Sequence, residues 1–175
     1  MPILKLTNLA TYKAYCADIA AKHKDIDGYK WGDENVITND SRSDLPKRFL
    51  WAMPYDQAKY GDKHSDNVMR SKVARVAYMI NPQDGKFSTL EAAYEFCEAV
   101  VEQIFARVLQ DKRGKMVAIV DPPGEEWQMI VTDINSWKTG PVEKTFGSTK
   151  YVGCELEMTF MENTNLAFDA SKWND

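Results

Sequence analysis

The sequence predicts an α+β fold in a single domain, and three segments carry this prediction. Residues 88–110 repeat apolar side chains at helical spacing over most of their length. Residues 70–80 and 150–161 carry the apolar runs and alternation that are typical of strands. A helical segment also opens the chain, so the expected order is α-β-β-β-α-β-β-β. This order favours a mixed, mainly antiparallel sheet with two packed helices over residues 1–162, followed by a polar tail at 163–175.

The first third of the chain is expected to hold the opening helix and two strands. Residues 7–23 place apolar side chains on one helical face, and either Thr7 or Asn8 can cap the helix. The bulky residues of segments 29–37 and 47–53 then indicate strands, with turn residues between them.

The middle of the chain combines a long loop with two well-marked elements. Residues 55–69 are polar and are expected to form an exposed loop, of a length that is usually functional or mobile. Residues 70–80 carry apolar side chains on both faces, which indicates a central strand covered on both sides. Ser88 and Glu91 have the spacing of a capping box at the start of the second helix. Gly114 is expected to end that helix.

The last third is expected to be mainly β-structure. Residues 116–120 and 127–134 flank a turn rich in proline and glycine, so they predict a β-hairpin. Residues 135–147 are expected to form a second long loop. The closing strand at 150–161 alternates apolar and polar side chains, which predicts one buried face and one face in contact with water.

The composition excludes a globally basic surface for nucleic acid and shows no targeting segment. The chain has 26 acidic and 22 basic residues, so its net charge is −4 at pH 7. Its three cysteines form no CxxC pair, which suits buried free thiols in a reducing compartment. No secretory signal is visible, and no apolar run reaches the roughly 20 residues that span a bilayer. We therefore expect a soluble protein made inside a cell.

Few residues have the spacing of a catalytic or metal-binding motif. Asp62, His64 and Asp66 alternate along one segment, so in an extended conformation they could meet one metal ion, as in a small metal-dependent hydrolase. An exposed hydrophilic loop accounts for the same three residues. His23, at the end of the first helix, suits a capping role. Because no nucleophile–base motif or phosphate-binding loop is present, we expect neither an enzyme nor a bound cofactor.

Two groups of charged residues bear on nucleic acid. Arg70, Lys72 and Arg75 lie close together in one predicted strand and offer a small basic site, the third functional alternative. Glu155 and Glu157 lie on the wet face of the closing strand. Acidic side chains there would not hold nucleic acid, because strong binding of phosphate needs a cationic surface.

The aromatic content suggests that part of the surface contacts other proteins. The chain has five tryptophans, seven phenylalanines and eight tyrosines, more than the two helices need. Aromatic residues in loops and tails are enriched in protein–protein interfaces, although they also pack over the ends of a core. The candidates for an oligomer interface are Tyr60, Trp137, Phe146, Phe168 and Trp173.

The order of elements resembles that of the tail terminator or tail completion proteins of tailed bacteriophages. The matching segments are the helices at 7–23 and 88–110 and the strands at 47–53, 70–80 and 152–160. The resemblance implies a structural protein without cofactor or enzymatic activity. It also implies a homo-oligomeric ring, usually a hexamer, that stops growth of the tail tube and joins the tail to the head.

The same resemblance implies partners, contact regions and a location. A closed ring needs head-to-tail contacts between copies, for which residues 55–69, 135–147 and 163–175 are the candidates. The expected partners are further copies of this chain, the tail tube and neck or connector proteins. DNA would pass without specific binding, and no membrane is involved. The protein would be assembled in the bacterial cytoplasm and reside in the virion. A neck, connector or baseplate component is the neighbouring alternative.

Overall fold

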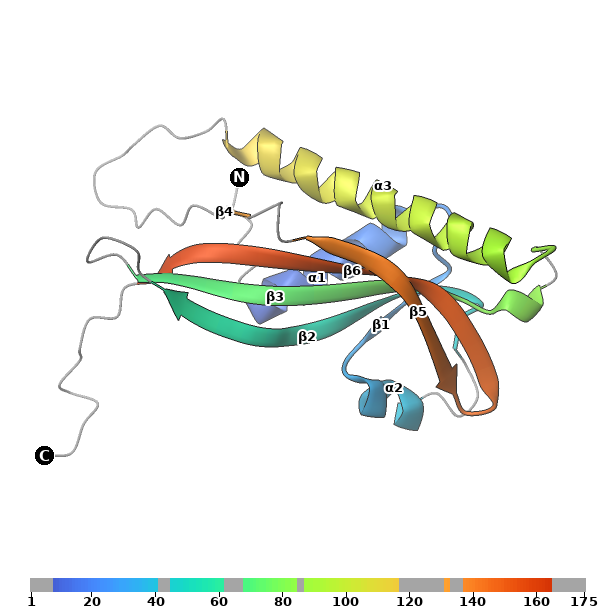
Figure 1. Ribbon diagram of the computed structural model, residues 1–175. Coiled ribbons are helices and arrows are strands. Elements are labelled where there is room, and N and C mark those ends of the chain that lie inside the picture. Colours follow the sequence, from blue (N-terminus) through green and yellow to red (C-terminus); the bar gives the residue numbers. More distant parts are fainter. Residues whose placement is uncertain are drawn as a thin grey trace, which may run out of the picture.

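The computed structural model describes residues 8–40, 45–61, 68–84, 87–116, 131–132 and 137–164. Within these residues the helices are α1 (Leu9–Lys22), α2 (Glu34–Asp40) and α3 (Leu90–Met116), with a short 3₁₀ helix η1 (Pro82–Asp84). The strands are β1 (Gly28–Trp31), β2 (Arg48–Gly61), β3 (Val68–Ile80), β4 (Val131–Thr132), β5 (Lys138–Phe146) and β6 (Thr149–Thr164). The predicted α+β class is confirmed (Figure 1).

The described strands form one mixed sheet. Its order is β1-β2-β3-β6-β4, and β5 pairs with β6 beside this path. The short edge strand β1 runs parallel to β2, whereas the other described pairs are antiparallel. The predicted mixed sheet did not specify which strands would be parallel. The parallel pair arises because a helix, α2, connects β1 to β2, and a helical crossover returns the chain in the same direction.

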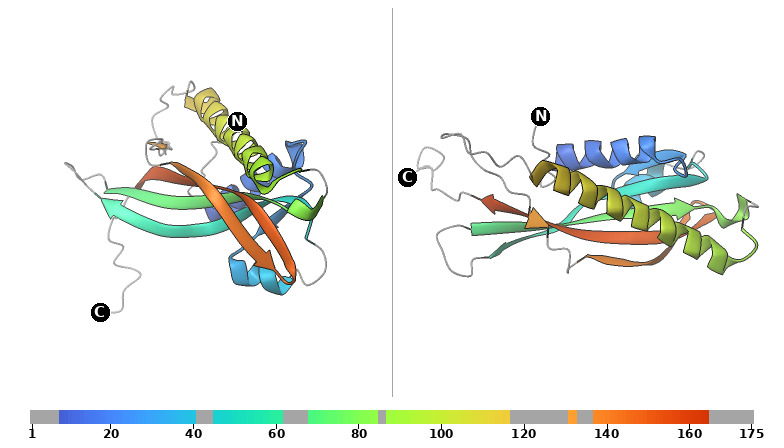
Figure 2. Two further views of the ribbon diagram at one scale, coloured as in Figure 1. Left: turned by 45° about the vertical axis from the view of Figure 1, so that its right-hand side comes forward. Right: turned by 90° about the horizontal axis from the view of Figure 1, so that it is seen from above.

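Helices α1 and α3 lie side by side on one face of the sheet (Figures 1 and 2). Alternate residues of β2, β3 and β6 point toward them, which explains why these strands carry apolar side chains at every second position. The main core between the layers includes the fully buried side chains Tyr12, Leu50, Val76, Tyr78, Ile80, Ile104, Leu156 and Phe160. Burial of these side chains is the main source of stability for the two-layer arrangement.

The opposite face of the sheet curls around a second, smaller core. The rings of Trp51 on β2 and Phe146 on β5 lie 5.6 Å apart, although β3 and β6 separate these two strands in the sheet. The Nζ of Lys144 on β5 also lies 2.6 Å from the carboxylate of Glu34 on α2. Strand β5 therefore bends toward α2 (Figure 1). The buried members of this second core are Ile37, Phe49, Trp51, Ala77, Met79, Phe146 and Tyr151.

The starts of the two long helices differ in how well they were predicted. At α1, Oδ1 of Asn8 accepts the backbone N–H groups of Ala10 and Thr11, so Asn8 is the cap among the two predicted candidates. At α3 the expected capping box of Ser88 and Glu91 is wrong. The helix begins two residues after Ser88, and Oγ1 of Thr89 accepts the N–H of Ala92 instead.

The end of α3 was also predicted wrongly. The helix passes through Gly114 and ends at Met116. A glycine inside a helix costs only about 1 kcal/mol, less than the surrounding helical turns contribute.

The strand predicted at residues 29–37 is wrong beyond Trp31. Gly32 has a φ of +135°, a conformation that interrupts the strand and that other residues rarely adopt. Oδ1 of Asp33 then accepts the N–H of Val36 at 2.9 Å and caps α2. The apolar residue Ile37 therefore belongs to a helix that covers the second core, not to a strand.

Both long loops were also predicted wrongly. Strand β2 continues to Gly61 and β3 already begins at Val68, so most of residues 55–69 is a hairpin. Residues 138–146 of the second predicted loop form β5. Cross-strand hydrogen bonds and one-sided packing hold polar strands that have no clear apolar pattern of their own. Most of the hairpin predicted between residues 116 and 134 lies outside the described residues, apart from the helical Met116 and the short β4.

Candidate functional site

A bulge in β2 determines which polar groups meet on the sheet. Met53 pairs with Arg75 and Gln57 pairs with Val73, so residues 54–56 stand opposite a single residue of β3. Pro54 begins this extra segment and has no backbone N–H for the ladder. Bulges re-aim side chains, and this one sends its next two residues to opposite faces of the sheet.

On the face of the sheet that carries α1 and α3, two tyrosines pack at the bulge. The rings of Tyr55 and Tyr12 stack with centroids 5.1 Å apart. The hydroxyl of Tyr12, a fully buried residue of α1, donates to the backbone carbonyl of Arg75 at 3.0 Å. Burial raises the pKa of Tyr12 well above its ordinary value, so the hydroxyl remains a donor. Tyr12 thus fastens α1 to the strand at the bulge.

Replacing Tyr12 with phenylalanine is expected to lower the free energy of unfolding by about 1–2 kcal/mol, because the partly buried carbonyl of Arg75 loses a hydrogen-bond donor. Chemical denaturation of the two proteins measures this difference. Tyr29→Phe is the matched control, since its hydroxyl donates to the backbone of Lys13 at an exposed position. A loss at Tyr12 no larger than that at Tyr29 would contradict the assignment.

On the opposite face, Arg75 is surrounded by three carboxylates from β2 and β6. Its Nη2 lies 2.6 Å from Asp56, and its Nε lies 3.2 Å from Glu157 and 3.7 Å from Glu155. We call these four residues the Arg75 cluster. Lys138 on β5 adds a weaker contact, with its Nζ 4.0 Å from Glu157. Burial is the largest cause that raises the pKa of Glu155 above its ordinary value, and Arg75 opposes this rise.

The Arg75 cluster is organised as an ion-pair network. Its carboxylates direct their oxygens at Arg75, and within the described part of the chain no group of three or more acidic, histidine or cysteine side chains could hold a metal ion. Arg75 is correspondingly occupied, which weakens the alternative of a phosphate site at Arg70, Lys72 and Arg75. The Nζ of Lys72 lies 4.8 Å from the ring centroid of Tyr55, and the side chain of Arg70 lies outside the described residues.

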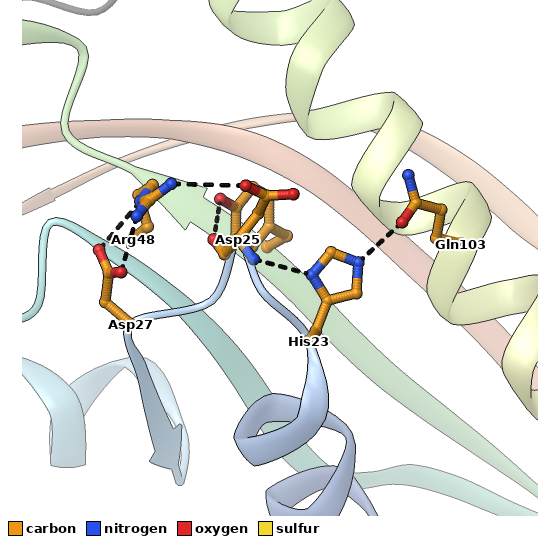
Figure 3. Close-up of polar contacts among 6 residues, drawn as sticks. His23, Asp25, Asp27, Arg48 and Gln103 are labelled. Carbon is orange, nitrogen blue, oxygen red and sulfur yellow. Dashed lines mark hydrogen bonds and ion pairs between the residues drawn. The ribbon is translucent and has the colours of Figure 1, made fainter.

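A second polar network surrounds the turn between α1 and β1 (Figure 3). Arg48 contacts Asp27 through two hydrogen bonds of 2.8 and 2.9 Å, and Asp25 more distantly at 3.6 Å. His23 bridges to α3, because its Nε2 lies 3.0 Å from Oε1 of Gln103. The hydroxyl of Tyr78 donates to the backbone carbonyl of Asp25 at 2.6 Å.

The imidazole of His23 takes part in the structure of this turn. Its Nδ1 accepts the backbone N–H of Asp25 at 3.2 Å, so the hydrogen bond to Gln103 Oε1 requires the proton on Nε2. Both ring nitrogens are therefore used. His23 is also the C-terminal cap of α1, with its N–H bonded to the carbonyl of Ile19. This arrangement agrees with the predicted capping role and makes the network a structural tie between the two long helices.

The structure leaves part of the predicted site residues untested. Tyr60 belongs to β2, but its side chain lies outside the described residues. The same applies to the metal alternative and to the aromatic residues of the tail, namely Asp62, His64, Asp66, Phe168 and Trp173.

The two remaining interface candidates pack within the chain. The ring of Trp137 lies 4.9 Å from that of Phe105 on α3 and 6.3 Å from that of Phe160 on β6, centroid to centroid. Within the described part of the chain, its buried Nε1 has no hydrogen-bond partner. Phe146 is 3% exposed and belongs to the second core. Its ring is therefore not available to a partner in this fold.

The three cysteines are buried free thiols, as expected. Burial raises the pKa of Cys16 and that of Cys97 to about 12, so neither side chain offers a thiolate nucleophile near neutral pH. For Cys154 burial is likewise the largest cause of a raised pKa.

Comparisons with protein-family models and with curated proteins gave no match to this chain. Among the described helices, none is both long enough and apolar enough to cross a membrane.

Proposed function

We propose that this chain is a structural assembly protein of the phage tail terminator or tail completion type, which acts as a closed homo-oligomeric ring. It would cap the tail tube and contact neck or connector proteins, with DNA passing through. Its place would be the virion, after assembly in the bacterial cytoplasm. The proposal needs no enzymatic activity and no cofactor.

The observation that carries this proposal is the long antiparallel ribbon formed by β2, β3 and β6. These strands have 14, 13 and 16 residues, whereas strands in globular proteins usually have about five or six. Helices α1 and α3 cover only one face of the ribbon, and α2 covers only one end of the other (Figure 2). Among the described residues the ribbon thus has a largely open face and an open edge, which are better suited to contacts between subunits than to enclosing a small substrate.

The edges of the sheet offer surfaces for a second copy. Strand β1 pairs with β2 only between Phe49 and Ala52. Within the described residues, no strand pairs with the outer edge of β2 from Met53 to Gly61. Unpaired edges present backbone donors and acceptors to other chains. In this proposal the edges take over the role first expected of loops at 55–69 and 135–147.

The Arg75 cluster supports the passage of DNA without tight binding. The cation on the open face of the ribbon is matched by three carboxylates, so it offers little attraction to phosphate. The cluster combines Glu155 and Glu157, the two acidic residues first assigned to such a surface. Retention of the chain on DNA-cellulose at low salt would contradict this part of the proposal.

Native mass spectrometry of the purified chain over a range of concentrations tests the proposal. We expect a discrete closed oligomer, for a hexamer of 20.0 kDa chains about 120 kDa, either alone or after addition of tail-tube protein. Capping of tail-tube ends in electron micrographs would separate a terminator from a neck, connector or baseplate component. A chain that stays monomeric under all these conditions and carries one bound metal ion would refute the proposal in favour of a hydrolase.

A further inference from the structure

The flank of α3 that faces away from α1 carries a row of exposed glutamates. Gln103 and Asp111 mark the opposite flank, because they contact His23 and Tyr15 of the α1 region. Spacings of three and four residues place the glutamates together on one side of the helix. They form no ion pair within the described part of the chain. This acidic flank comprises Glu91, Glu95, Glu98 and Glu102.

The other side of the domain carries unpaired lysines. Lys13 of α1 lies over the ring of Trp31, with its Nζ 5.6 Å from the centroid. Lys24 is exposed in the turn that follows α1, and Lys30 is half-buried on the edge strand β1. Within the described residues none of the three forms an ion pair with a carboxylate. We call Lys13, Lys24 and Lys30 the basic edge.

Most acidic residues near the basic edge have partners of their own. Asp18 forms an ion pair with a lysine of the same helix, Asp27 forms two hydrogen bonds with Arg48, and Asp25 lies 3.6 Å from the same guanidinium group. Asp33 caps α2 with a carboxylate oxygen and keeps its charge. Among the described residues the three lysines of the basic edge therefore lack a carboxylate partner, as the glutamates of the acidic flank lack a cationic one.

The sheet register places the two sides at the same level along the strands. Lys30 pairs with Trp51, and the row continues through Ala77 and Glu155 to Gly140 on β5. Along the strand direction, the acidic flank begins before this row of paired residues and ends after it. Near one end of the flank, Tyr94 interacts with Glu143 of β5. Beyond its other end, Phe105 contacts Trp137, directly before β5.

We propose that the acidic flank of α3 docks against the basic edge of a second copy, and that this contact generates the head-to-tail ring. The inference depends on the proposed ring function. A rotation about an axis along the strands would bring the glutamates of one copy opposite the lysines of the next. A two-fold contact through either surface would instead set like charges against each other, so the pattern selects the head-to-tail arrangement.

The charges set orientation and rate more than total affinity. An exposed ion pair contributes little by itself, and salt screens it within about 10 Å at 0.1 M ionic strength. Complementary patches nevertheless steer association and suppress the wrong pairing. Assembly should therefore weaken as the salt concentration rises.

Charge reversal provides the test, with two single-surface variants and their combination. The flank variant contains Glu95→Lys, Glu98→Lys and Glu102→Lys. The edge variant contains Lys13→Glu, Lys24→Glu and Lys30→Glu. The combined variant contains all six changes and serves as the matched control, because its two surfaces are again complementary. Circular dichroism and thermal unfolding verify that each variant folds.

Native masses of the variants give the result. We expect each single-surface variant to remain monomeric at concentrations where the unmodified chain forms a ring. The combined variant should recover the ring, and an equimolar mixture of the two single-surface variants should form rings in which they alternate. If the unmodified chain forms a ring and both single-surface variants form the same ring, the docking inference is overturned and the proposed function stands. If the unmodified chain assembles neither alone nor with tail-tube protein, both are overturned.

Discussion

Replacing Gly153 with alanine is expected to lower the free energy of unfolding by about 3 kcal/mol or more. Gly153 lies in β6 opposite Met79 of β3. A Cβ at this position would collide with the backbone carbonyl oxygen of Tyr78 and lie 2.8 Å from the sulfur of Met79. The strand that carries this carbonyl is paired on both sides, so it cannot move without breaking its ladder. Urea denaturation measures the loss.

Gly140→Ala is the matched control. Gly140 lies in β5 and also pairs with β6, but a Cβ there meets no atom within 4 Å. Its effect should stay within about 0.5 kcal/mol. The Gly153 variant should also perturb the near-ultraviolet circular dichroism of the second core, where Trp51 lies against Phe146. Equal and small effects at the two glycines would show that the sheet can curl without this close approach.

The parts of the fold that were predicted from sequence are those whose own apolar pattern is buried. Apolar side chains point toward the main core from helices α1 and α3 and from strands β3 and β6. The spacing of these side chains was therefore enough to predict the four elements from the sequence. The Asn8 cap was likewise visible, because the side chain acts on N–H groups two and three residues away. These are local signals that do not depend on distant partners.

The parts that were missed depend on distant partners. The second half of β2 and the whole of β5 are polar, and they are strands because β3 and β6 supply their hydrogen-bond partners. Helix α2 was missed for a different reason. Val36 and Ile37 are β-branched residues that suggest a strand, whereas the conformation of Gly32 and the cap from Asp33 start a helix there.

The Arg75 cluster was only partly accessible from sequence. The alternation of Glu155 and Glu157 with apolar residues predicted their shared face. The two glutamates reach Arg75 because β3 pairs with β6, which lies far away in the sequence. Asp56 reaches Arg75 because of the bulge in β2. Pro54, in the middle of a bulky strand, was the available signal for a bulge. It was interpreted instead as the end of the strand.

Replacing Arg75 with methionine is the second change from which we expect a large effect. Methionine keeps much of the side-chain length but leaves Asp56, Glu155 and Glu157 together without their main cation. Removing one partner of a buried pair costs roughly 3–5 kcal/mol, but these side chains are partly exposed to water. We therefore expect a loss of about 2 kcal/mol in the free energy of unfolding near pH 7, measured by chemical denaturation.

The pH dependence of this loss distinguishes charge repulsion from lost packing. Burial already raises the pKa of Glu155 above its ordinary value of 4.5, and loss of Arg75 should raise it further. A carboxyl group with a raised pKa in the folded state binds its proton more readily there than in the unfolded chain. The stabilisation that comes from this stronger proton binding in the folded state is present below pH 4.5. It is lost as the pH rises through the raised pKa of the folded state.

The deficit of Arg75→Met relative to the unmodified protein should therefore shrink as the pH falls from about 7 toward about 4.5. Adding Glu155→Gln to the variant should recover part of the stability near pH 7, because one of the repelling charges is gone. In the presence of Arg75 the same glutamine also removes an ion pair, so it should recover less than in the methionine variant. The loss in the free energy of unfolding could instead be the same at every pH and unchanged by Glu155→Gln. Arg75 would then stabilise the fold through the packing of its aliphatic stem and not through its charge.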